Sequence, residues 1–249
     1  MLTYKQMRDI ARKQFAVDLN CSPDDFVRDG IVFCEARENP GRRPFLRGER
    51  HFEMYTMGGA VIVSATPDIL PYIRKELDGK TRDEAFCMPF VYGPGHIFLP
   101  DDPAALPMPG GFDYEMLEQN AIFALYERIS REDFPHSVVH DINHPRPDIL
   151  AVSASVGGKV VGLAGASDDC EMMWQIGIDV LPEYRGHGLA MSLTNMLALE
   201  IMRRGKVPYY AASMSNIASQ RTAYRAGFEV AYTVAFRGRF DGEMTSPTG

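Results

Sequence analysis

The feature that most constrains this chain is a junction between an apolar strand and an amphipathic helix. An apolar run ends at Val180, and a tight turn containing Gly186 and Gly188 follows it. Four apolar residues then recur at helical spacing: Leu189, Leu193, Leu197 and Ile201. In this arrangement the free N–H groups of the first helical turn point at one spot, where they and the helix dipole favour an anion such as a phosphate. The sequence therefore predicts an anionic ligand at residues 185–190.

Two common phosphate-binding motifs do not fit this junction. A P-loop needs a Gly, four further residues, and then Gly, Lys and Ser or Thr. Here Gly205 and Lys206 are followed by Val207, and Glu200 stands where the first Gly should be. A dinucleotide fingerprint needs a small third residue, which in this chain is Met191. These mismatches disfavour a P-loop enzyme and a nucleotide-binding oxidoreductase.

A third motif fits, and it carries a resemblance to a known family. Arg185, Gly188 and Ala190 satisfy the order Arg, two residues, Gly, one residue, Gly or Ala after a strand. Here the chain resembles the GNAT superfamily of acetyl-CoA-dependent N-acyltransferases. Further on, Asn216 precedes the last predicted helix and Tyr224 lies on it, which resembles the second half of the GNAT pattern. Two motifs in the right order are more specific than either alone, and the resemblance covers about residues 112–236.

The resemblance implies an α/β (α+β) fold with a mixed, mostly antiparallel central sheet flanked by helices. Local signals predict the elements. Gly157 and Gly158 indicate a hairpin between two strands. Residues 112–123 are ambiguous between strand and helix, and 122–139 predict one or two helices broken at Pro135. The other expected elements are strands at 149–156, 160–166, 207–213 and 228–236, and helices at 188–205 and 217–226.

The first hundred residues predict a smaller mixed α and β domain that resembles no known family. Expected elements are helices at 3–17 and 68–77, and strands at 31–34, 52–57 and 60–65, the last two as a hairpin. The basic segment Arg42, Arg43, Arg47 and Arg50 is interpreted as a solvated loop, with an anion site as the alternative. Prolines and glycines at 93–111 indicate a linker, so we predict domains at 1–110 and 111–249.

Composition limits the partners and the compartment. A net charge of −7 argues against a nucleic-acid surface, and no apolar run is long enough to predict a membrane span. A polar N-terminus without the apolar core of a signal peptide favours the cytoplasm. The four dispersed cysteines are interpreted as reduced thiols. His136, His140 and His144 recur every fourth residue, but a helix would spread them over about 12 Å, so no metal is expected.

The resemblance also implies a site for acetyl-CoA as cosubstrate. The pantetheine arm would pair with the edge of the strand at 176–180, where Gly177 is interpreted as a bulge. The pyrophosphate would bind the N–H groups of the 185–190 turn. The implied coenzyme-binding residues are Ile178, Asp179, Val180, Arg185, Gly186, His187, Gly188, Leu189, Ala190, Asn216 and Ser219.

Two proton-transfer roles follow from the resemblance. Tyr224 matches the tyrosine that in many relatives protonates the departing sulfur, and a phenol with a pKa near 10 is protonated at neutral pH. The alternative for Tyr224 is an aromatic ring packed inside the last helix, and the alternative for Asn216 is a cap of that helix. The identity of the general base is left open, because Trp174 stands where some relatives carry a carboxylate. Glu171 is the first candidate, followed by Asp168 and Asp179, and deprotonation through water is the alternative.

The sequence thus predicts an N-acetyltransferase that moves an acetyl group from acetyl-CoA to a primary amine by direct attack. The acceptor is expected to be a small molecule or a peptide, with no nucleic acid or membrane partner, and a homodimer is left open. A non-catalytic coenzyme A-binding regulatory module is the alternative function.

Overall fold

The computed structural model describes residues 2–44, 50–101 and 103–245. The chain divides into two compact units. Unit 1 comprises residues 1–7, 98–211 and 217–229, and unit 2 comprises residues 8–97, 212–216 and 230–249. Three strands contribute residues to both units: β5 (Gly95–Pro100), β10 (Val207–Ser213) and β11 (Phe228–Ala235).

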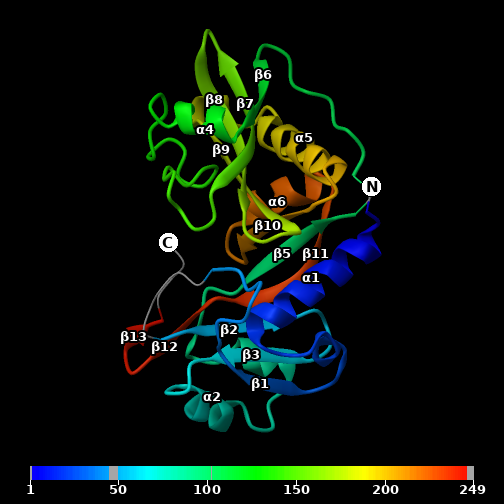
Figure 1. The fold of residues 1–249 in the computed structure, drawn as a ribbon, viewed down its shortest axis with the longest axis vertical. Coiled ribbons are helices and arrows are strands. Elements are labelled where there is room, and N and C mark those ends of the chain that lie inside the picture. Colours follow the sequence, from blue (N-terminus) through cyan, green and yellow to red (C-terminus); the bar gives the residue numbers. More distant parts are fainter. Residues whose placement is uncertain (1, 45–49, 102, 246–249) are drawn as a thin grey trace. The chain divides into compact units, whose positions relative to one another are not determined.

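Unit 1 is built on a sheet with strand order β10, β9, β8, β7, β6, in which only the β9–β10 pair is parallel (Figure 1). Its strands are β6 (Asp113–Glu118), β7 (Asp148–Val156), β8 (Lys159–Asp168) and β9 (Met173–Val180). Its helices are α4 (Gln119–Leu125), α5 (Leu189–Arg203) and α6 (Ile217–Arg225), with a short 3₁₀ helix η2 (Pro182–Tyr184). The predicted hairpin is confirmed: Gly157 and Gly158, both at positive φ, form its two-residue turn.

The two faces of this sheet are covered differently. Helix α5 packs on β7, β8 and β9 and buries its predicted apolar stripe completely. A Cβ atom at Gly162 would meet Leu189 of α5, whereas one at Gly165 would overlap the carbonyl oxygen of Ser137. Positions three apart on a strand point to opposite faces, so a loop around Ser137 covers the face away from α5.

Unit 2 is a mixed α and β unit with strand order β1, β3, β2, β11 and a second small sheet, β13, β12, β4. Its strands are β1 (Ile31–Glu35), β2 (Phe52–Thr56), β3 (Val61–Ala65), β4 (Val91–Tyr92), β12 (Arg237–Phe240) and β13 (Glu243–Met244). Its helical segments are η1 (Pro23–Val27), α2 (Leu70–Leu77), α3 (Arg82–Phe86) and most of α1 (Tyr4–Leu19). The predicted hairpin is present as the antiparallel pair β2–β3.

Three local predictions are wrong. Of the predicted helix at 122–139, only the part up to Leu125 exists, in α4, and the rest is an irregular loop. The predicted linker at 93–111 contains β5, whose residues Ile97, Phe98 and Leu99 are fully buried. Pro94 and Pro100 lie at the ends of that strand. Because prolines are typical of loops, composition alone predicts a linker here and not a strand.

The third concerns the basic segment, where Arg42 and Arg43 do not lie in a solvated loop. Their side chains are 5% and 12% exposed. Arg43 pairs with Asp18 at 2.5 Å, and Arg42 donates to the Asp18 carbonyl oxygen at 2.9 Å. Both arginines therefore form ion pairs within unit 2. Arg47 lies outside the described residues.

Candidate functional site

The strands β9 and β10 separate midway along β9. Their parallel register runs from Met173 opposite Val207 to Ile176 opposite Tyr210, and stops there. On its other side, β9 stays paired with β8 as far as Val180. Residues 177–180 therefore present backbone groups on an edge that no strand covers within the described residues. An extended ligand with amide groups can pair with such an edge.

The predicted glycine turn lies directly beyond this edge. Gly186 and Gly188 both adopt positive φ, and Gly188 is the N-cap residue of α5. Throughout this turn, all of which is described, no side chain caps the helix, and Arg185, Gly186 and His187 are exposed. The Arg185 side chain donates to the Val180 carbonyl oxygen at 2.8 Å, which ties the turn to the end of β9. The N–H groups of the first helical turn are therefore available to an anion.

Helix α6 lies beside the point where β9 and β10 part. Tyr210, the last β10 residue paired with β9, shares a 2.7 Å hydrogen bond with Ser219 of α6. Tyr210 is buried, and burial raises the pKa of its phenol. Sequence reasoning missed Tyr210, because nothing in a Tyr-rich and Ala-rich strand marks one ring as the link to α6.

Tyr224 is on the same helix and is 47% exposed. Its ring meets the edge of Phe98 at 5.4 Å between centroids. A tyrosine that only filled the core would be buried, so this exposure leaves the phenol accessible to a ligand. Asn216 precedes α6, and its backbone N–H donates to Ser213.

A family model for GNAT acetyltransferase matches residues 109–235, which hold both the strand edge and the glycine turn. The chain belongs to the GNAT acetyltransferase family. Among curated proteins, none matches.

Three solved structures illustrate the likeness. A GNAT-family acetyltransferase from Novosphingobium aromaticivorans is 18% identical, over 58% of this chain and 63% of that one, with a TM-score of 0.45. A GCN5-related N-acetyltransferase-like protein from Streptococcus suis is 20% identical, over 72% of each chain, with a TM-score of 0.43. A GCN5-related N-acetyltransferase from Kribbella flavida is 15% identical, over 68% of this chain and 64% of that one, with a TM-score of 0.46. The chain thus spans less than two thirds of the Novosphingobium and Kribbella structures.

In this GNAT chain, Gly177 has a different role from the predicted bulge. The β8–β9 register is unbroken from Gly162 opposite Val180 to Asp168 opposite Trp174, so the bulge prediction is wrong. A Cβ atom at Gly177 would overlap the carbonyl oxygen of His136. Glycine is needed here because the covering loop approaches the strand backbone closely.

Asp179 holds the same loop in place. Its Oδ2 atom accepts hydrogen bonds from the backbone N–H groups of His136 and Ser137, each at 2.7 Å. The carboxylate of Asp179, one of the predicted candidates for the base, is therefore bound to the backbone of the loop.

The other two carboxylates predicted as the base lie at the far end of β9. Glu171 is exposed in the turn between β8 and β9, where its carbonyl oxygen accepts from Lys206 at 2.6 Å. Asp168 is exposed and lies opposite Trp174. The structure therefore does not bring Glu171 or Asp168 together with residues 177–180.

A polar row crosses the sheet on the loop-covered face, and sequence reasoning missed it. Asp148, Ser167, Gln175 and Tyr209 lie opposite one another on β7, β8, β9 and β10. The Tyr209 hydroxyl contacts Gln175 Oε1 at 3.0 Å and donates to the buried carboxylate of Asp169. Partners this distant in sequence leave no local pattern.

Asp169 and Asp148 anchor the two ends of this row. Asp169 also accepts from Ser167 Oγ at 2.7 Å and pairs with Arg146 at 3.3 Å. Asp148 accepts from Tyr126 at 2.5 Å and from the Val139 N–H at 2.7 Å, while burial raises the pKa of its carboxyl. These bonds fix the covering loop and the strand ends beneath it.

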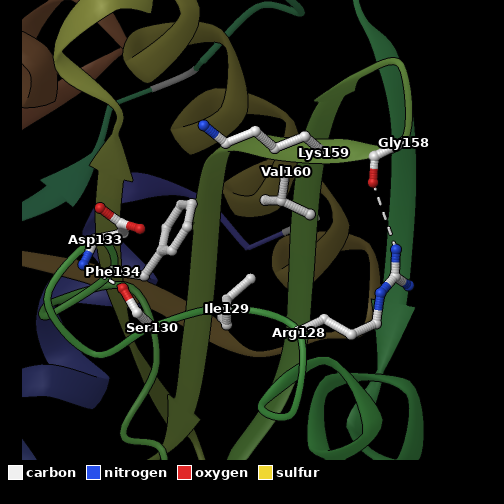
Figure 2. Close-up of a pocket in the computed structure, with 8 residues that line it drawn as sticks. All are labelled: Arg128, Ile129, Ser130, Asp133, Phe134, Gly158, Lys159 and Val160. Carbon is white, nitrogen blue, oxygen red and sulfur yellow. Dashed lines mark hydrogen bonds between the residues drawn. The ribbon is translucent and has the colours of Figure 1, made fainter.

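A separate pocket of about 130 Å³ lies beside the β7–β8 turn. Figure 2 shows the side chains that line it. None of the predicted site residues lines it. The lining residues are Arg128, Ile129, Ser130, Asp133, Phe134, Gly158, Lys159 and Val160. The pocket is therefore distinct from the strand edge and the glycine turn.

The three spaced histidines do not share a helix face. His140 adopts positive φ and its Nε2 contacts the Phe134 carbonyl oxygen at 3.0 Å, while His144 Nδ1 contacts Arg146. Within the described ranges there is no group of three or more His, Cys, Asp or Glu side chains that could hold a metal ion. Over the same ranges, no helix combines the length and apolar character of a membrane span.

Proposed function

We propose that this GNAT protein transfers an acetyl group from acetyl-CoA to a primary amine of a small molecule or peptide. The observation that carries the proposal is the uncovered edge at 177–180, which leads directly into an uncapped helix N-terminus at Gly188. The first feature suits a chain of amides, and the second suits a pyrophosphate. Acetyl-CoA carries both groups in that order. Family membership supports acetyl transfer as the reaction class.

In this proposal each part of the site has one task. The amine nitrogen attacks the thioester carbonyl carbon, and backbone N–H groups near residues 178–180 stabilise the oxyanion that forms. When the tetrahedral intermediate collapses, the carbon–sulfur bond breaks and the Tyr224 hydroxyl protonates the departing thiolate. The exposure of Tyr224 supports this role. Asn216 and Ser219 are proposed to contact the pantetheine arm.

The amine must lose a proton, and we propose water as its first acceptor. Trp174 stands where a carboxylate could have served, and the carboxylate of Asp179 already accepts two backbone N–H groups. A base role for Glu171 stays a prediction. Measuring the pH profile of Glu171→Gln tests it, since loss of the base would remove an acidic limb from that profile.

Calorimetry tests the proposed coenzyme site. We expect acetyl-CoA to bind and NAD to bind far more weakly. Gly188→Glu places a bulky anion against the proposed phosphate position and is expected to abolish acetyl-CoA binding. Gly110→Glu is the matched control, because no atom lies within 4 Å of a Cβ atom there and its φ is ordinary. NAD binding as tight as acetyl-CoA binding, or normal acetyl-CoA binding by a folded Gly188→Glu variant, would contradict the assignment.

A further inference from the structure

Helix α6 carries Tyr224 but has little packing of its own. It has nine residues, and among them only Ala223 is buried. An isolated helix this short is marginal in water. Hydrogen bonds at its two ends therefore contribute to holding it in position. One of them, the bond between Tyr210 and Ser219, lies in its first turn.

Asn195 of α5 supplies the bond at the other end of α6. Its side chain is 2% exposed, and its Nδ2 donates to the Ala226 carbonyl oxygen at 3.1 Å. The same Nδ2 donates to the Ala104 carbonyl oxygen at 3.0 Å, and Oδ1 accepts from the Leu106 N–H at 3.0 Å. One buried amide thus joins α5, the end of α6 and the segment at 103–107. Without it, three backbone groups would lose their partner, and that of Ala226 is buried, where an unpaired polar group is costly.

Asp101 and the segment at 103–107 complete the support of the α6 end. The Asp101 N–H donates to the Gly227 carbonyl oxygen at 3.0 Å. Gly227 has positive φ, and Pro103 would lie 2.9 Å from a Cβ atom there. Ser192 of α5 also holds this segment, through a 3.0 Å bond to the Pro107 carbonyl oxygen, but it has no bond to α6. Ser192 therefore offers a control in which the segment is loosened and the direct bond to α6 is kept.

We propose that Asn195 is a positioning residue that holds α6, and with it the Tyr224 hydroxyl, in place relative to α5. Tyr224 lies two residues before the carbonyl group that Asn195 binds. Since α5 also provides the proposed phosphate site at its N-terminus, Asn195 fixes the acid against the helix that holds the coenzyme. The inference rests on the proposed function, because it assigns Tyr224 as the acid.

Asn195→Ala and Ser192→Ala, in the full chain, separate positioning from general stability. We expect Asn195→Ala to lower kcat by about 10- to 100-fold, since a displacement of about 1 Å can cost 10²-fold, with a small change in KM for acetyl-CoA. Hydrogen exchange of residues 217–227 should rise in this variant. Ser192→Ala should change kcat and the exchange of α6 much less, because it keeps the direct bond from Asn195 to α6. If Asn195→Ala does not fold, Asn195→Asp, which keeps the size and the acceptor, is measured in the same way.

A double variant tests whether Asn195 acts through Tyr224. In the Tyr224→Phe background, Asn195→Ala should cause no further loss of kcat. Equal exchange of α6 in the Asn195 and Ser192 variants, or a full additional loss in the double variant, would overturn the inference. Unchanged turnover of Tyr224→Phe alone would instead remove the acid role from the proposed function. The exchange comparison would still decide whether Asn195 holds α6.

Discussion

Gly165 and Gly177 lie opposite each other on β8 and β9, and the backbone of the covering loop passes directly over both. A Cβ atom at Gly165 would overlap the Ser137 carbonyl oxygen, and one at Gly177 would overlap that of His136. Because neither glycine has a side chain, the pair leaves a notch in the surface of the sheet into which the loop backbone fits. Because Gly177 begins the uncovered edge of β9, the notch sets the loop beside the proposed coenzyme strand.

Alanine at either glycine should displace the loop. We expect Gly165→Ala and Gly177→Ala each to lower the free energy of unfolding by about 1–3 kcal/mol, as overpacking does. Denaturant unfolding measures the loss, with Gly110→Ala as the control at a site without nearby atoms. Stability equal to that of Gly110→Ala would show that the loop does not approach the sheet this closely.

Asp179 should hold the loop rather than the coenzyme. Asp179→Ala removes the acceptor of two backbone N–H groups, so hydrogen exchange at residues 136–139 should speed up. The affinity for acetyl-CoA should change little, since the backbone of β9 is kept. Asp168→Ala, at the far end of the sheet, is the control. Unchanged protection of the loop would contradict this role.

Glu200 should make the stability of the fold depend on pH in the acidic range. Hydrogen bonds from Arg203, and from Arg204, lower the pKa of Glu200 to about 2. A folded-state pKa below the ordinary value of 4.5 stabilises the fold above pH 4.5, and this stabilisation is lost as pH falls toward 2. The stability advantage of the wild type over Glu200→Gln should therefore shrink over this range.

Thermal unfolding between pH 7 and pH 2.5, at low and high salt, measures this advantage. Salt should reduce it, because the Arg203 partner is 70% exposed. Glu183→Gln is the control, since Glu183 lies 3.9 Å from Lys159 and both are exposed. An advantage of Glu200 that is constant with pH would mean that its ion pairs do not form in solution.

The predicted boundary near residue 110 stays a prediction, and truncation tests it. The 111–249 fragment is expected to bind acetyl-CoA with lower stability than the full chain. It lacks Ala104 and Leu106, which Asn195 binds, and residues 54–56 of β2, with which β11 pairs. A 98–249 fragment contains Ala104 and Leu106 and should melt at a higher temperature than the 111–249 fragment. If neither fragment is soluble, the chain is one folding unit.

Local signals in the sequence were enough for much of unit 1. The Gly157–Gly158 hairpin, the apolar stripe of α5 and the turn at Gly188 each follow from neighbouring residues, and all three are confirmed. The resemblance to GNAT proteins, carried by Arg185, Gly188 and Ala190, is confirmed by the family model.

Several of the failures involve partners that are distant in sequence. The pattern at 126–139 predicts a helix, but the backbone N–H groups of His136 and Ser137 bind Asp179, 43 and 42 residues further along the chain. Asn195 gives no local sign that it binds Ala104 and Ala226. Arg43 looks like a surface cation, yet Asp18 and Tyr55 bind it inside unit 2. Tertiary contacts override local pattern at each of these positions.

Thiol release from acetyl-CoA, measured with the purified full chain against polyamines, aminoglycosides, amino acids and lysine peptides, tests the central claim most directly. We predict amine-dependent release for at least one class, with a matching acetylated product. Tyr224→Phe should lower kcat by about 10²- to 10⁴-fold, with nearly unchanged acetyl-CoA affinity and melting temperature. Tight acetyl-CoA binding without release for any amine, or full turnover of Tyr224→Phe when the chemical step limits the rate, would contradict the account.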